Sequence, residues 1–137
     1  MKTYVFVFAR GGSRALPGKN IKILRGLPLI AHSIRLAQKL DGVERIFVST
    51  EDIAIAQVAR KYSANVIDRP KTLAQDDSPE WLAWRHAVDW VEKHVGPFDR
   101  FVSLPATSPL RNKCDVERCI VGLDDETDCV VGITKSR

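Results

Sequence analysis

Tyr4-Val5-Phe6-Val7-Phe8-Ala9 is a nearly unbroken apolar run in which β-branched and aromatic residues dominate. A segment rich in glycine and basic residues follows it, from Arg10 to about Lys19. A short apolar run bounded by turn residues is typical of a strand buried on both faces, as in the centre of a parallel sheet. The sequence therefore predicts a central strand that ends at an irregular loop.

The rest of the chain alternates apolar runs with segments of helical period. We expect strands over residues 45–50, 64–67, 101–104 and 129–133, and helices over residues 29–40, 52–62, 78–94 and 114–123. This alternation is typical of a mostly parallel sheet covered by helices. The predicted fold class is α/β, as a three-layer α/β/α, Rossmann-like domain.

The helix expected over residues 78–94 has strong signals at its start. Ser78 is predicted to cap it, with Pro79 at the first helical position and Glu80 in the first turn. Its tryptophans, including Trp81 and Trp84, are predicted to face the core rather than to stack on a ligand.

The chain has 137 residues, of which 45% are hydrophobic and 28% are charged. These values predict one globular domain over residues 1–137. No apolar run approaches the roughly 20 residues that a membrane span needs, and the N-terminus lacks the order of a secretory signal. We therefore expect a cytoplasmic protein with no membrane association. No motif of a nucleic-acid-binding domain indicates a nucleic-acid partner.

Positive charge is concentrated near the N-terminus. The formal net charge is +4, but residues 1–40 contain eight Lys or Arg residues and no Asp or Glu. This asymmetry indicates a local anion site, although chance and ordinary solvated faces account for it equally well.

The cysteines form no C-x-x-C pair and have no metal-ligand spacing with the histidines. We therefore expect free, buried thiols in a reducing compartment at Cys114, Cys119 and Cys129.

The loop after the first strand reads Ala9-Arg10-Gly11-Gly12-Ser13-Arg14-Ala15-Leu16-Pro17-Gly18-Lys19-Asn20. In an open α/β sheet, ligands bind beyond the carboxyl ends of the strands, where this loop and those at residues 69–78 and 105–112 are expected. The adjacent glycines permit close backbone approach and expose N–H groups to an anion, and three basic side chains add positive charge. These features predict a polyphosphate-binding segment.

Two common phosphate-binding signatures are absent from this loop. The P-loop needs G-x-x-x-x-G-K-[ST], but Ser13 stands five residues before Gly18, and Asn20 follows Lys19. The dinucleotide signature G-x-G-x-x-G fails because the glycines are adjacent. A purely structural turn is the alternative, and it explains the glycines better than the basic residues.

Ala9-Arg10-Gly11-Gly12-Ser13, followed after five residues by Lys19-Asn20, resembles the nucleotide-binding signature of the CMP-sialic acid synthetases (acylneuraminate cytidylyltransferases). Three later segments resemble the same family: Val-Ser-Thr-Glu at 48–51, Arg69-Pro70 with Leu-Ala-Gln-Asp-Asp-Ser at 73–78, and Thr-Ser-Pro-Leu-Arg at 107–111. Four segments in register make the resemblance specific. The related Kdo cytidylyltransferases share the Leu-Pro-Gly-Lys part of the first loop.

The resemblance implies the fold of the nucleotide-diphospho-sugar transferases and a defined activity. The anomeric hydroxyl of an acidic nine-carbon sugar attacks the α-phosphate of CTP, giving the CMP-sugar and pyrophosphate with Mg²⁺ assistance. Such enzymes serve surface polysaccharide biosynthesis. The alternatives are a catalytically incomplete nucleotide-binding module and a Kdo-type cytidylyltransferase.

The resemblance also implies roles for single residues. Catalytic roles fall to Arg10, Arg14 and Lys19. The nucleotide would be bound by Ala9, Arg10, Gly11, Gly12, Ser13, Lys19, Asn20, Arg69, Asp76 and Ser78. The sugar side would be formed by Thr107, Ser108 and Arg111.

The chain departs from the family pattern in three respects. Arg14 stands where the family often has Lys, and Pro105 stands where it commonly has Gln on the sugar side. N-acetylneuraminic, legionaminic and pseudaminic acid are therefore equally plausible sugars. Family members are also much longer, so we expect a truncated chain. The expected Mg²⁺-binding aspartates and the segment that forms the homodimer would lie beyond residue 137.

Overall fold

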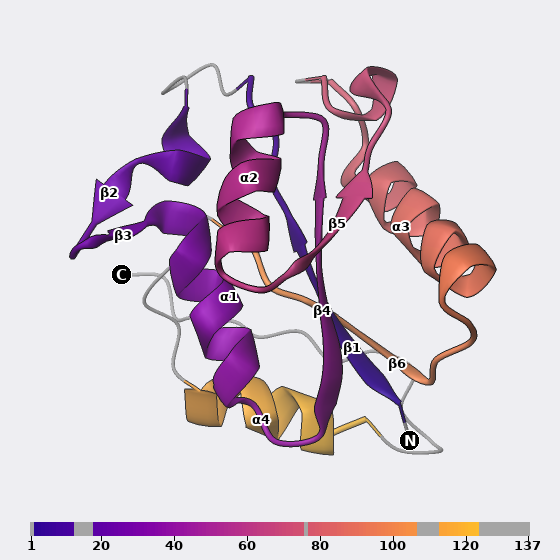
Figure 1. Ribbon diagram of the computed structural model, residues 1–137. Coiled ribbons are helices and arrows are strands. Elements are labelled where there is room, and N and C mark those ends of the chain that lie inside the picture. Colours follow the sequence, from indigo (N-terminus) through magenta and orange to yellow (C-terminus); the bar gives the residue numbers. More distant parts are fainter. Residues whose placement is uncertain (1, 13–17, 76, 107–112, 124–137) are drawn as a thin grey trace, which may run out of the picture.

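β1 (Thr3–Phe8) lies in the centre of a four-stranded sheet, between β4 (Val43–Thr50) and β6 (Arg100–Ser103) (Figure 1). β5 (Asn65–Asp68) pairs with the other edge of β4, so the strand order is β5-β4-β1-β6, and all three pairings are parallel. The computed structural model describes residues 2–12, 18–75, 77–106 and 113–123. The predicted central strand, buried on both faces, is confirmed.

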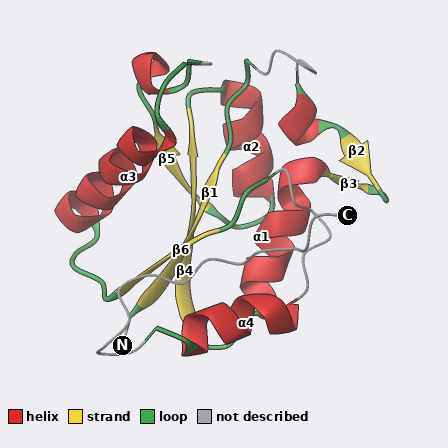
Figure 2. Cartoon of the chain, turned by 180° about the vertical axis from the view of Figure 1, so that it is seen from behind, coloured by secondary structure: helices red, strands yellow, loops and turns green. Residues whose placement is uncertain are grey.

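Helices cover both faces of this sheet. α1 (Leu29–Lys39), α2 (Ile53–Lys61) and α4 (Lys113–Val121) lie on one face, and α3 (Glu80–His94) lies on the other (Figures 1 and 2). The predicted three-layer α/β/α, Rossmann-like fold is thereby confirmed. In the described part of the chain, no helix is long and apolar enough to cross a membrane.

The two faces of the sheet differ in chemistry because side chains alternate along β1. Val5 and Val7 belong to the aliphatic core under α1, α2 and α4, whereas Phe6 belongs to the core under α3. Phe6 stacks on Phe47 and Phe101, with ring centroids 5.3 and 4.7 Å apart. These rings fill the space above the sheet, and the residues that α3 buries fully against them are small.

The inward residues of α3 are Ala83, Ala87 and Val91. The prediction that its tryptophans face the core is therefore wrong for Trp81, which is 56% exposed, and for Trp84, which is 37% exposed. Trp90, by contrast, is partly buried and packs against the aromatic core, with its ring 6.4 Å from that of Phe47. Trp84 contacts Phe101, with ring centroids 5.9 Å apart.

The start of α3 also differs from the prediction. Pro79 is its N-cap and no side chain caps the helix, so Pro79 precedes the first helical position. The Ser78 hydroxyl instead donates to the carbonyl oxygen of Thr72 at 2.9 Å. The predicted Ser78 cap is wrong because this hydroxyl closes the loop between β5 and α3.

Several short elements of the structure were not predicted from the sequence. They are the 3₁₀ turns η1 (Lys19–Ile21) and η2 (Lys71–Leu73), and an antiparallel hairpin of β2 (Ile23–Leu24) and β3 (Leu27–Pro28). Elements of two or three residues are too short to show a hydrophobic period. The strand expected over residues 129–133 lies outside the described residues.

The prediction of buried thiols is wrong for Cys114, which is exposed on α4. Cys119 is partly exposed, and Cys129 lies outside the described residues. α4 turns Val116 and Ile120 toward the core, and this narrow stripe leaves both cysteines on its outer sides.

We expect Ala87→Leu to lower the free energy of unfolding by about 1–3 kcal/mol, because the added methylene groups have no space against the aromatic face. Arg85→Leu places the same side chain at an exposed position of α3 and is the matched control, with a change within about 0.5 kcal/mol. Urea unfolding followed by circular dichroism measures both variants. Equal stability of the two would contradict the tight contact.

Candidate functional site

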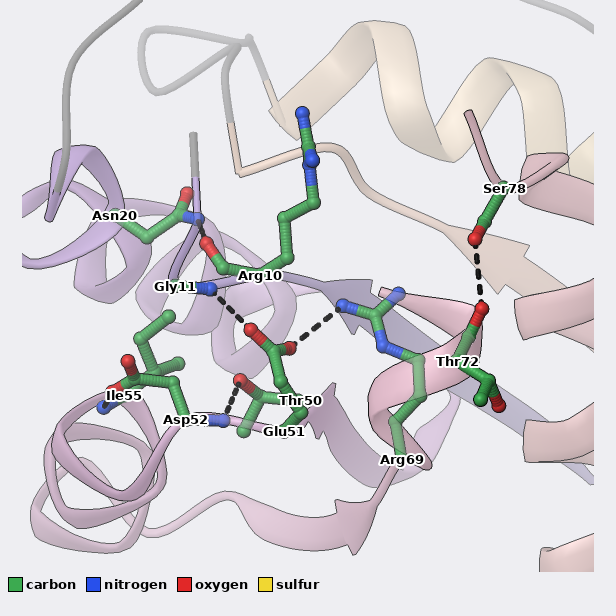
Figure 3. A network of polar contacts seen from close by, with 10 residues as sticks. All are labelled: Arg10, Gly11, Asn20, Thr50, Glu51, Asp52, Ile55, Arg69, Thr72 and Ser78. Carbon is green, nitrogen blue, oxygen red and sulfur yellow. Dashed lines mark hydrogen bonds and ion pairs between the residues drawn. The ribbon is translucent and has the colours of Figure 1, made fainter. Parts of the chain in front are cut away.

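Three neighbouring strands end at one edge of the sheet, and a charged residue follows each of them. Arg10 lies after β1, Glu51 after β4 and Arg69 after β5. The backbone ladder continues past the strand ends, since the N–H groups of Ala9 and Arg69 donate to carbonyl oxygens of β4 at 3.1 and 3.0 Å. Residues far apart in the sequence are thereby held side by side (Figure 3).

A cavity of about 310 Å³ lies at this edge. Arg10, Lys19 and Arg69 bring three cationic side chains to its lining, against the carboxylate of Glu80. The other lining residues are Phe8, Asn20, Leu73, Gln75, Ser78 and Ala83. The volume and the excess of positive charge suit an anionic small molecule.

Asn20 and Gly18 fix the backbone at the two ends of the segment that follows β1. Asn20, which is 7% exposed, donates from Nδ2 to the carbonyl oxygen of Arg10 at 2.9 Å. Gly18 has φ of 71°, in the left-handed region that favours glycine, and directly precedes η1. Arg10 and Lys19 therefore reach the cavity from opposite ends of the loop.

Gly11 packs against the start of α2. A Cβ atom at this position would overlap the carboxylate of Asp52. That carboxylate has no freedom to move without a cost, because its Oδ1 accepts the Ile55 N–H at 3.0 Å and caps the helix. At Gly12, an added Cβ would meet nothing within 4 Å. The two glycines of the loop thus have different structural roles.

Glu51 connects this loop to the loop after β5. Its Oε1 accepts the Gly11 N–H at 2.6 Å, and its Oε2 lies 3.5 Å from Nη2 of Arg69 (Figure 3). Burial lowers the pKa of Arg69, the Glu51 carboxylate acts in the opposite direction, and Arg10 lowers that pKa further. The guanidinium stays protonated at neutral pH.

This contact corrects one prediction and adds one residue. The Gly11 N–H, predicted to be open to an anion, is taken by Glu51. Sequence reasoning included Glu51 in a family-like segment but assigned it no role. The signal that could have found it is its position, since it directly follows a buried strand next to the central strand.

The structure brings together five of the residues predicted to bind the nucleotide. The five that line the cavity are Arg10, Lys19, Asn20, Arg69 and Ser78. Three further predicted nucleotide-binding residues do not line it: Ala9, Gly11 and Gly12. The remaining predicted site residues, including the catalytic Arg14 and the three on the sugar side, lie outside the described residues: Ser13, Arg14, Asp76, Thr107, Ser108 and Arg111.

The resemblance to the family implies a Mg²⁺ ion, which carboxylate oxygens would bind. Among them, no three His, Cys, Asp or Glu side chains come together as metal ligands. Glu51, the carboxylate between the two loops, is already engaged by a backbone N–H and an arginine. The described part of the chain thus presents no cluster of carboxylates for Mg²⁺.

Comparison with known proteins gives consistent matches. The sequence profile of a family described as cytidylyltransferase matches residues 4–86. The chain is 35% identical over 120 residues to 3-deoxy-manno-octulosonate cytidylyltransferase 2 of Hydrogenovibrio crunogenus, covering 88% of this chain and 46% of the relative. It is 39% identical over 115 residues to the CMP-N,N'-diacetyllegionaminic acid synthase of Legionella pneumophila, covering 81% and 48%.

A solved structure agrees with these sequence matches. CMP:2-keto-3-deoxy-manno-octonic acid synthetase, complexed with CTP, superposes with a TM-score of 0.74 at 25% sequence identity. The superposition covers 89% of this chain and 47% of that protein. The fold of this chain is thus shared with a protein whose structure was solved in complex with CTP.

The chain belongs to the cytidylyltransferase family. The resemblance carried by its four sequence segments is confirmed, since its relatives include synthases of CMP-nonulosonic acids. The chain spans about half the length of the curated relatives that it matches.

We expect Gly11→Ala to cost about 0.5–2 kcal/mol of stability, because the new methyl group displaces Asp52 from its capping position. Gly12→Ala makes the same change in open space and should be neutral or slightly stabilising. In an Asp52→Ala background, the cost of Gly11→Ala should shrink, because the obstructing carboxylate is gone. Thermal unfolding measures all four variants. An equal cost in both backgrounds would contradict the steric explanation.

Proposed function

We propose that this chain forms the nucleotide-binding part of a cytidylyltransferase that activates an acidic sugar with CTP. The observation that carries the proposal is the cavity at the carboxyl edge of the sheet, where Arg10, Lys19 and Arg69 meet. The family match, the legionaminic acid relative and the solved relative complexed with CTP support it.

The chemistry asked of these side chains is positioning and charge neutralisation. The sugar hydroxyl attacks the α-phosphate, and pyrophosphate leaves with its negative charge. Transfer of this kind needs little covalent work from the protein. Arg10 and Lys19 would hold the phosphates, while Arg69 and Ser78 would border the base and ribose. A donor that acts on the transition state contributes roughly 10²–10³ in rate, by analogy with oxyanion-hole donors.

The proposed sugar class is a nonulosonic acid. Relatives named for legionaminic acid and for 3-deoxy-manno-octulosonate bring both nine-carbon acids and Kdo into the test. The proposed sugar contacts are Thr107, Ser108 and Arg111. A Mg²⁺ cofactor, a homodimer in the longer protein, a cytoplasmic location and a role in surface polysaccharide biosynthesis complete the proposal.

Pyrophosphate release tests the activity directly. The protein is incubated with CTP, Mg²⁺ and, in separate reactions, N-acetylneuraminate, legionaminate, pseudaminate and Kdo. We expect release that needs both CTP and one of these acids, and the acid that supports it identifies the sugar. CTP binding without release would leave a nucleotide-binding module. Absence of CTP binding would refute the proposal.

Lys19 and Lys22 form a matched pair for the phosphate assignment. Lys19 lines the cavity, whereas Lys22 is exposed three residues further on and is not among its lining residues. We expect Lys19→Ala to weaken CTP binding at least tenfold, because a charge-assisted contact to phosphate is lost. Lys22→Ala should change it less than about twofold. Isothermal titration calorimetry measures the CTP affinity of both variants. Equal losses of affinity in the two would mean that the triphosphate binds elsewhere.

A further inference from the structure

Glu51 lies beside the cavity but has no role in the proposed function. It is not among the lining residues of the cavity, and its side chain is only 13% exposed. Each of its oxygens faces a different loop, Oε1 toward Gly11 and Oε2 toward Arg69 (Figure 3). The carboxylate therefore lies behind the cavity, between its two cationic loops.

The ion pair with Arg69 has an unusual geometry for a structural ion pair. Arginine and carboxylate commonly form two parallel hydrogen bonds. Here Nη2 approaches Oε2 only to 3.5 Å, and among the described residues the buried Nε and Nη2 of Arg69 have no hydrogen-bond partner. Buried donors without partners are unfavourable. Glu51 thus contacts Arg69, a residue that lines the cavity, without satisfying its buried donors.

Of the two contacts of Glu51, the hydrogen bond from the Gly11 N–H is stronger than the ion pair with Arg69. At 2.6 Å it is a short, charge-assisted hydrogen bond to the backbone of the loop that carries Arg10. One carboxylate thus contacts both Arg69 and the backbone of that loop.

We propose that Glu51 is a positioning residue that couples the loop after β1 to Arg69, so that the two ends of the bound nucleotide are held at a set separation. This inference rests on the proposed function. Glu51 would act through its contacts with Gly11 and Arg69, since it is not among the lining residues of the cavity.

Two explanations of Glu51 predict opposite effects on anion binding when its carboxylate is removed. If Glu51 only balanced charge, its removal would strengthen the binding of anions, because one negative charge leaves the neighbourhood of the site. If it positions the loop, its removal weakens their binding despite the more favourable charge. Glu51→Gln keeps an oxygen acceptor for Gly11 and loses only the charge, whereas Glu51→Ala loses both.

The binding experiment compares wild type, Glu51→Gln, Glu51→Ala and Glu44→Gln, with CTP and inorganic tripolyphosphate as probes. Glu44 is exposed at the other end of β4 and is the control for the change itself. We expect Glu51→Ala to bind both probes about tenfold more weakly. Glu51→Gln should bind tripolyphosphate within about threefold of wild type but CTP more weakly, since only the hold on Arg69 is lost. Equal or tighter binding of both probes by Glu51→Ala overturns the inference.

Amide hydrogen exchange tests the coupling without any ligand. We expect the Gly11 N–H to exchange at least about tenfold faster in Glu51→Ala and faster in Arg69→Lys, because Arg69 restrains the carboxylate that protects it. Glu51→Gln should keep most of the protection and serves if Glu51→Ala fails to fold. Exchange of Gly11 that is unaffected by Arg69→Lys overturns the coupling. If wild type binds no CTP while the exchange result holds, the proposed function fails and the coupling stands.

Discussion

The parallel ladder through β5, β4 and β1 is the constraint on which the candidate site depends. Its strands end at one edge, so the backbone hydrogen bonds of the ladder bring Arg10, Glu51 and Arg69 close together. The register of this ladder is well specified, because a slip of one residue would exchange the aliphatic and aromatic faces of β1. The position of the cationic cavity is thus a consequence of the hydrophobic pattern of the strands.

Charge and burial oppose each other at this edge. Arg69 is 8% exposed and lies close enough to Arg10 for that charge to lower its pKa. Two cations held together beside the cavity repel each other, and Glu51 offsets part of this repulsion. An anionic ligand would offset the rest. The arrangement therefore favours ligands that bring several negative charges, and a neutral sugar alone has little to gain from it.

The fold class, the central strand and four helices were predictable, because their hydrophobic periods extend over several turns or a whole strand. The glycine loop was predictable as a cationic segment from its composition. The exposure of Trp81 and Trp84 was not, since it depends on aromatic residues such as Phe47 and Phe101 that come from other strands. The role of Glu51 was hidden for the same reason: its partners lie 40 and 18 positions away, and one of them is a backbone N–H.

The order of the strands also bears on how the chain is made. β5, β4 and β1 lie within the first 68 residues, but β6 joins β1 only after α3 has been synthesised. The contact of the Lys2 N–H with Asp99 spans 97 positions. A growing chain thus carries β1 with one open edge until residue 103 leaves the ribosome. Because Phe101 arrives last, the aromatic layer stays incomplete during that interval, and the nascent domain is then most exposed to pairing with a wrong strand.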